Sequence, residues 1–118
     1  MSCTITEENQ AHVKKITFDW VSAADGTASG TTDGVYSGLV ERLVTIPDAT
    51  DAPDDNYNVV INDEDETDIL MGAGAARDTA STEQVLASSL GCVANDKLTL
   101  AITGAGAANG GTVILYIK

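Results

Sequence analysis

The sequence predicts an all-β fold, an antiparallel β-sandwich or jelly-roll-like barrel of about seven or eight strands. Apolar and polar residues alternate with a period of two in several short segments, which is the pattern of half-buried strands. Eleven Gly residues and many Thr, Ser, Asp and Asn residues supply turns between those segments. Only 4% of the residues are aromatic, so Val, Ile and Leu have to provide most of the core.

A length of 118 residues fits one domain with its own hydrophobic core. Residues 1–11 are polar apart from a brief alternation at Thr4, Ile5 and Thr6, which predicts an N-terminal arm or an edge strand. Residues 12–118 are predicted to form a single β domain. His12, which precedes the first clear strand, is expected on the surface.

The first clear strand is predicted within residues 12–23, where Ile16, Phe18 and Trp20 share one parity and are expected to face the core. Residues 24–34 carry no apolar side chain larger than Ala, which predicts a long flexible loop. Such a loop either becomes ordered on a neighbouring subunit or has no role. Residues 35–46 are predicted as a strand, because β-branched residues and Pro47 outweigh a locally helical Gly-Leu-Val-Glu-Arg-Leu segment.

The segment 56–79 is predicted to form the central hairpin of the domain. It follows a solvated turn at residues 47–56, which contains two Pro and four Asp. Tyr57, Val59 and Ile61 alternate with less apolar neighbours and predict a strand. After an acidic corner, the apolar run 69–71 is expected to lie back against that strand, and the small residues 72–76 then lead away.

The last third of the chain is predicted to contain three strands. Residues 78–84 are polar and predict a turn, and residues 85–94 predict a strand with an irregular start. Asn95-Asp96 predicts a tight hairpin connection to a cleanly alternating strand at 97–103. A turn at 104–111 joins this strand to the closing strand 112–118, and we expect these two to be antiparallel neighbours.

The net charge of −12 argues against two classes of partner. A protein that binds nucleic acid needs a basic surface, and six scattered basic residues do not provide one. An anionic membrane surface is disfavoured by the same repulsion. The charge favours solubility and leaves a protein partner open.

Cys3 and Cys92 are two isolated thiols without the spacing of a zinc site. The start of the chain has no basic segment followed by an apolar run, and no stretch approaches the roughly 20 apolar residues that span a bilayer. These observations favour a reduced protein made in the cytoplasm, with both thiols free. A Cys3–Cys92 bridge between the N-terminal segment and a late strand is the alternative.

The acidic cluster at residues 63–68 is the only candidate for a metal site. Asp63, Asp65 and Asp68 would offer carboxylate oxygens, which are calcium ligands. The EF-hand pattern fails, because its sixth and twelfth positions would be Asp68 and Gly74 instead of Gly and Glu. A hydrated turn that keeps a sheet edge from pairing is the favoured interpretation, and we expect neither a metal nor another cofactor.

Catalytic patterns are not found in the sequence. The single His has no recognisable nucleophile near it, and no Gly-x-Ser-x-Gly motif is present. The glycines at 72–74 and 104–106 resemble only fragments of nucleotide-binding loops. We therefore expect a protein that is not an enzyme. Arg42 and Arg77 are the candidate partner-binding residues, and each of them can instead pair with a nearby carboxylate.

Three segments from about Gly38 to the end of the chain resemble a family of small β-rich virion structural proteins of tailed bacteriophages. They are RLVTIP, DNYNVVINDEDETDILMGAGAARDTASTEQ and LTLAITGAGAANGGTVILYIK. The resemblance implies a head decoration or minor capsid protein that binds the major capsid protein and stabilises the shell. It implies a virion location after synthesis in the host cytoplasm, and it supplies no catalytic residue.

A repeated unit of this kind is expected to form a symmetric homo-oligomer, with a trimer favoured where three capsid subunits meet. Two alternatives stay open. One is a tail or head–tail connector component, and the other is a calcium-dependent carbohydrate-binding β-sandwich module.

Overall fold

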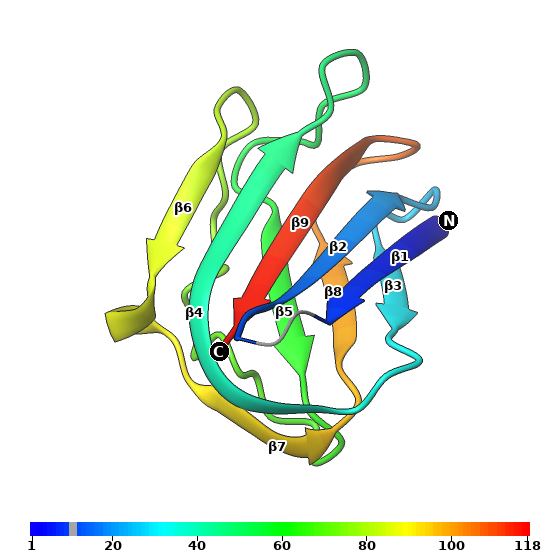
Figure 1. Cartoon of the computed structure of the whole chain (residues 1–118). Coiled ribbons are helices and arrows are strands. Elements are labelled where there is room, and N and C mark those ends of the chain that lie inside the picture. Colours follow the sequence, from blue (N-terminus) through cyan, green and yellow to red (C-terminus); the bar gives the residue numbers. More distant parts are fainter. Residues whose placement is uncertain (10–11) are drawn as a thin grey trace.

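A computed structural model describes residues 1–9 and 12–118 and shows two antiparallel sheets packed face to face (Figure 1). The six-stranded large sheet has the order β1-β2-β9-β4-β6, and β7 also pairs with β4. The three-stranded small sheet has the order β3-β8-β5. The fold class is thus the predicted all-β sandwich.

The described part of the chain contains nine strands and one short 3-10 helix. They are β1 (Ser2–Asn9), β2 (Lys14–Val21), β3 (Ala28–Thr31), β4 (Tyr36–Pro47), β5 (Asn58–Asn62), β6 (Glu83–Leu86), η1 (Ala87–Ser89), β7 (Cys92–Asp96), β8 (Thr99–Thr103) and β9 (Gly110–Ile117).

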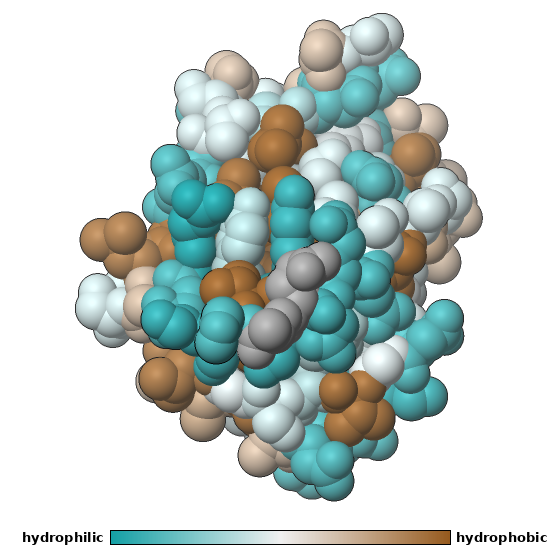
Figure 2. All heavy atoms as spheres, viewed as in Figure 1, coloured by the Kyte–Doolittle hydropathy of each residue, from teal (hydrophilic) through white to brown (hydrophobic). Residues whose placement is uncertain are grey.

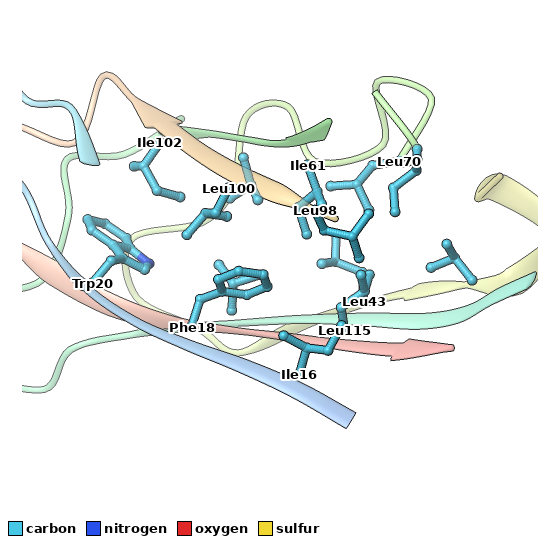
Figure 3. Close-up of a cluster of buried hydrophobic side chains, with 14 of the residues drawn as sticks. Ile16, Phe18, Trp20, Leu43, Ile61, Leu70, Leu98, Leu100, Ile102 and Leu115 are labelled. Carbon is cyan, nitrogen blue, oxygen red and sulfur yellow. The ribbon is translucent and has the colours of Figure 1, made fainter. Parts of the chain in front are cut away.

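The core lies between the two sheets and uses the inward side chains of both (Figure 3). Ile16, Phe18 and Trp20 of β2 are buried, as their shared parity predicts. The small sheet contributes Ile61, Leu100 and Ile102 from the opposite side, and Leu98, which directly precedes β8, lies beside them. Apolar area removed from water contributes about 25 cal/mol per Å², so this interior is the main stabilising term.

The N-terminal segment forms an edge strand of the large sheet and extends well beyond residues 4–6. β1 pairs with β2 over its whole length. The carboxylate of Glu7 links β1 to the chain before β4, because it accepts hydrogen bonds from Asp33 N (3.0 Å), Gly34 N (2.9 Å) and Tyr36 Oη (2.6 Å). Gln10 and Ala11, the end of the predicted arm, lie outside the described residues.

The predicted loop at 24–34 contains strand β3, which corrects the sequence expectation. β3 pairs with β8 in a continuous four-residue register. Its inward position at Gly30 has no room for a side chain because β1 passes close to it. A Cβ on Gly30 would lie 2.8 Å from Cys3 Sγ, so a larger side chain would push the two strands apart.

The closing part of the chain pairs differently from the prediction. β8 belongs to the small sheet and β9 to the large sheet, so these strands are not neighbours. The residues between them cross from one layer to the other with positive φ at Gly104, Gly106 and Ala108. Left-handed backbone at three positions reverses the chain over a short distance, which alternation alone does not reveal.

Two further predictions are wrong in detail. The strand at 85–94 is divided into β6, η1 and β7, and it ends later than predicted. Asn95 and Asp96 are the last residues of β7, which pairs with β4, so they do not connect a hairpin to β8. Asn95 adopts a φ of 57° at the register shift between β4 and β7, and Asp96 beyond it still pairs with Tyr36.

The central hairpin has one strand, β5, and a second arm made of turns. Ile69 and Leu70 are buried as expected, and Ile69 N donates to Ile61 O (2.8 Å), but Met71 is 72% exposed. The arm stays beside β5 through further backbone bonds, from Val59 N to Gly74 O (2.8 Å) and from Arg77 N to Tyr57 O (2.7 Å). It therefore covers the edge of the small sheet without forming a regular strand.

Candidate binding face

The register of the large sheet places alternate side chains on the surface that faces away from the core. We call this surface the outer face. Its residues are Ser2, Thr4, Thr6 and Glu8 on β1, Lys15, Thr17, Asp19 and Val21 on β2, Thr112, Ile114 and Tyr116 on β9, Arg42, Val44 and Ile46 on β4, and Gln84 and Leu86 on β6.

The middle of the outer face is apolar. Val44 and Ile46 on β4 pair with Ile114 and Thr112 on β9, and Tyr116 continues the same column. We call Val44, Ile46, Ile114 and Tyr116 the apolar strip, in which Val44 is buried and the other three side chains are half-buried. Figure 2 shows hydrophobic side chains over β4 and β9 with hydrophilic ones around them. Antiparallel sheets normally alternate apolar residues inside with polar residues outside, so this strip needs a separate explanation.

The outward surface of the small sheet shows the usual pattern and serves as an internal comparison. Its register brings together Ser29 and Thr31 of β3, Thr99, Ala101 and Thr103 of β8, and Asn58, Val60 and Asn62 of β5. Val60 is the one large apolar side chain in this described set. The outward surface of the small sheet is therefore polar, as is usual, and only that of the large sheet is apolar at its centre.

The outer face is also electrically distinct from the rest of the molecule. Its described strand residues include two bases, Lys15 and Arg42, and two acids, Glu8 and Asp19, so their formal charges cancel. The net charge of −12 is consequently carried by the remainder of the chain. Glu41 occupies the bulge between Val40 and Arg42 and has no partner in the register.

Arg42 and Tyr116 form a stacked pair at one end of the apolar strip. The guanidinium carbon of Arg42 lies 4.3 Å from the centre of the Tyr116 ring. Its Nη1 also donates to Gln84 Oε1 across the neighbouring strand (3.4 Å). A cation over an aromatic face is attracted by the ring quadrupole, and Arg and Tyr are both enriched at the centres of protein interfaces.

A polar hollow of about 400 Å³ opens at the other end of the outer face, beside the starts of β1 and β9. Asp19, Asp48 and Asp51 are among the residues that line it. Backbone hydrogen bonds from Asp51 (2.8 Å) and Thr50 (3.1 Å) lower the pKa of Asp48, so this carboxylate is ionised at neutral pH. The hollow can receive a basic or hydroxyl-bearing group of a partner.

The two arginines predicted to bind a partner lie in different settings. Arg42 is exposed on the outer face. Arg77 pairs locally, because its Nη1 lies 3.7 Å from Glu83 Oε1 and its Nε and Nη2 donate to Ala75 O (3.3 Å each). Arg77 thus pairs with a nearby carboxylate, which is the alternative that the sequence leaves open for both arginines. Only Arg42 lies on the candidate binding face.

The fold brings together two of the three acidic residues that are candidate calcium ligands in the sequence, and it places the third elsewhere. Asp63 and Asp65 come together with Asp96 of β7, with one ligand oxygen from each lying within 4.8 Å of the others. Asp68 lies apart and accepts hydrogen bonds from Ile61 N, Leu70 N and Gly72 N. Its role is to shape the turn after β5, which sequence spacing could not distinguish from metal binding.

The remaining candidates are placed as follows. Cys3 and Cys92 are free thiols in the described structure, and β2, β9 and β4 separate their strands within the large sheet. Burial raises the pKa of the Cys3 thiol, and the nearby carboxylate of Asp19 raises it further. His12 is exposed. Among the described residues, no helix has the length and apolar character needed to cross a membrane.

Comparison of the chain with protein-family models, with curated proteins and with solved structures finds no match.

The outer face is not among the sites that the sequence analysis predicts. A signal was present in β9, where Val113, Ile114, Leu115, Tyr116 and Ile117 are apolar on both parities. Such continuous runs are typical of strands that are covered on both faces.

Proposed function

We propose that this chain is a virion structural protein of a tailed bacteriophage that binds the head shell through the outer face and stabilises it. The observation that carries this proposal is the apolar strip at the centre of a neutral surface on an otherwise acidic molecule. The function is binding to the major capsid protein, and the chain performs no chemistry in this role.

The composition of the outer face supports a docking role. Protein interfaces have an apolar centre, a polar rim and an enrichment in aromatic residues and Arg. The strip supplies the centre together with the Arg42–Tyr116 pair. Thr4, Thr6 and Thr17 belong to the polar margin on β1 and β2. A neutral face also lets an acidic molecule approach a partner without turning its own charge toward it.

The link to a phage head rests on the family resemblance, and the resembling segments include the strands that form the strip. RLVTIP spans Arg42 to Pro47 and contains Val44 and Ile46, and the closing segment contains Ile114 and Tyr116. A protein that binds only the assembled shell shifts the equilibrium towards assembly. The stabilisation of the capsid then follows from binding alone.

The test begins with purified virions of the phage that encodes the chain. Mass spectrometry should find the polypeptide in intact particles, and the purified protein should sediment with undecorated capsids in a saturable manner. Absence from virions, or no binding to capsids, contradicts the proposal. Detection in isolated tails but not in heads would support the alternative of a tail or connector component.

The carbohydrate-binding alternative is tested by calorimetry with calcium and a glycan panel. The Asp63, Asp65 and Asp96 carboxylates give calcium a candidate position. A sugar usually also needs an open aromatic ring, but of the five aromatic residues, all of which are described, four are buried and Tyr116 lies under Arg42. Calcium-dependent heat with a glycan would replace the capsid proposal.

A further inference from the structure

β1 is a long edge strand with an unprotected side. Its eight residues pair with β2 without a shift in register, and β2 is the only described strand that pairs with it. Alternate N–H and C=O groups of an edge strand point away from its neighbour. β1 contains no Pro, and Ser2 to Thr6 carry no charge. Such an edge is a template for another strand.

The chain protects its other edges, which sets β1 apart. The edge of β5 is covered by the turns at 69–77 through backbone bonds to Tyr57, Val59 and Ile61. β3 and β6 are only four residues long. β6 and β7 share the far side of β4 and are separated by η1. Natural proteins prevent edge pairing with short strands, covering segments and charged side chains. β1 is neither short nor covered by a paired segment, and its charges are confined to Glu7 and Glu8, at one end of the strand.

We infer that β1 pairs antiparallel with β1 of a second copy of this chain, about a two-fold axis at Ile5. A continuous sheet requires paired side chains to share a face, so the axis must pass through a residue position. With the axis at Ile5, Thr4 lies opposite Thr6 of the second copy, Cys3 opposite Glu7, and Ser2 opposite Glu8. Each acid meets an uncharged side chain, whereas an axis at Glu7 would oppose two carboxylates.

The pairing joins two six-stranded sheets edge to edge and places both outer faces on the same side of the dimer. The resulting surface repeats the apolar strip about the axis. A two-fold pair uses the same edge in both copies and closes after two, so the geometry favours a dimer over the trimer that the resemblance implies. The inference is independent of capsid binding and goes beyond it.

Sedimentation equilibrium of the purified protein tests the pairing. The wild type should show reversible association to twice the 12.2 kDa chain mass. A Thr4→Lys/Thr6→Lys variant places like charges opposite each other at two positions and should raise the dimer dissociation constant at least about tenfold. A Thr4→Lys/Thr6→Glu variant places opposite charges there and should retain the dimer.

Thr17→Lys is the control, because it adds a cation to the same face on β2, away from the edge. It should leave the dissociation constant unchanged. A monomer, a trimer, or equal effects of the two double variants would overturn the inference. Hydrogen exchange of the wild type gives a readout that needs no variant, since the alternate amides within residues 2–8 that point away from β2 should gain protection as concentration rises through the dissociation constant. A concentration-independent exchange rate would overturn it equally.

Discussion

Trp20 is the largest side chain of the core, and its indole N–H lacks a hydrogen-bond partner in the described structure. It is 2% exposed, and its ring centre lies 5.7 Å from that of Tyr57. Its Nε1 has no hydrogen-bond partner among the described residues. A buried donor without a partner costs about 1–3 kcal/mol, which offsets part of what the ring contributes by packing.

Two substitutions separate these opposing effects. Trp20→Phe removes the unpaired N–H together with part of the ring, so we expect the free energy of unfolding to change by less than about 1 kcal/mol. Trp20→Ala leaves a large cavity and should cost about 3–5 kcal/mol. Urea unfolding followed by circular dichroism measures both. Equal, large losses would show that Nε1 is satisfied in solution.

Single residues also show what the sequence can predict and what it cannot. The inward parity of Ile16, Phe18 and Trp20 follows from period-two alternation and is confirmed. The acidic trio is different, because Asp96 joins Asp63 and Asp65 only through the path of β7. Sequence spacing reports local neighbours, and a contact across more than 30 positions depends on topology.

At the level of elements, Glu7 fixes β1 to the segment that precedes β4. Burial opposes ionisation of Glu7, but hydrogen bonds from Tyr36, Asp33 and Gly34 outweigh it and hold the pKa of the carboxyl below its ordinary value. Burial, and then the Glu7 contact, raise the pKa of Tyr36, so the phenol remains a donor. The pair is therefore stable as carboxylate and phenol at neutral pH.

Because the pKa of the Glu7 carboxyl is lowered, the stability that this contact contributes depends on pH. When the pKa of a carboxyl is lower in the folded state than in the unfolded state, its ionisation stabilises the fold. This stabilisation is fully present at pH values above the unfolded-state pKa of about 4.3, and it is lost as the pH falls through the folded-state pKa. Glu7→Gln should therefore be less stable than the wild type at pH 7, and the difference should shrink as the pH falls below the unfolded value of about 4.3 and through the lowered folded pKa. Urea midpoints across this range measure the effect. Glu8→Gln, on the exposed outer face, is the control, and parallel curves for wild type and Glu7→Gln would contradict the assignment.

The turn segment beside β5 depends on close approach of two backbones. Val59 N donates to Gly74 O, and a Cβ on Gly74 would overlap the carbonyl oxygen of Val59. Gly72, two positions earlier, has no atom within 4 Å of its Cβ position and a φ of +81°. The two glycines are thus required for different reasons, one steric and the other conformational.

Alanine at each position distinguishes these reasons. Gly74→Ala should lower the free energy of unfolding by about 1–3 kcal/mol because the segment must move away from β5. Gly72→Ala should cost about 1 kcal/mol through backbone strain alone. Hydrogen exchange at Val59 should accelerate only in Gly74→Ala. Unchanged exchange there would show that the segment does not depend on the close contact.

The elements predicted best are those with clean alternation, and pairing was predicted least well. The patterns of residues 12–23, 35–46 and 57–61 predict β2, β4 and β5, and each is confirmed as a strand. β3 cannot be predicted from alternation because Ala28, Ser29 and Gly30 carry no hydrophobic signal, although the close passage of β1 leaves no room for a side chain at Gly30. β8 and β9 were assigned to one hairpin because chain order does not reveal that the connecting turn crosses between layers.

At the scale of the whole molecule, the sandwich separates charge from apolar surface. The outer face of the large sheet is neutral and apolar at its centre, whereas the small sheet presents Asn, Ser and Thr and the rest of the chain carries the net charge of −12. This separation keeps the protein soluble through most of its surface and leaves one side suited to contact a partner.

The number of copies bound per undecorated capsid tests this separation most directly, when measured for two matched variants. Ile114→Lys places a charge in the apolar strip, and Val60→Lys places the same charge on the outward surface of the small sheet, where the native side chain is likewise half-buried. With circular dichroism confirming that both are folded, Ile114→Lys should reduce binding at least about tenfold, a loss of roughly 1.4 kcal/mol, while Val60→Lys binds as the wild type does. Full binding by Ile114→Lys, or an equal loss in both variants, would contradict the assignment of the outer face.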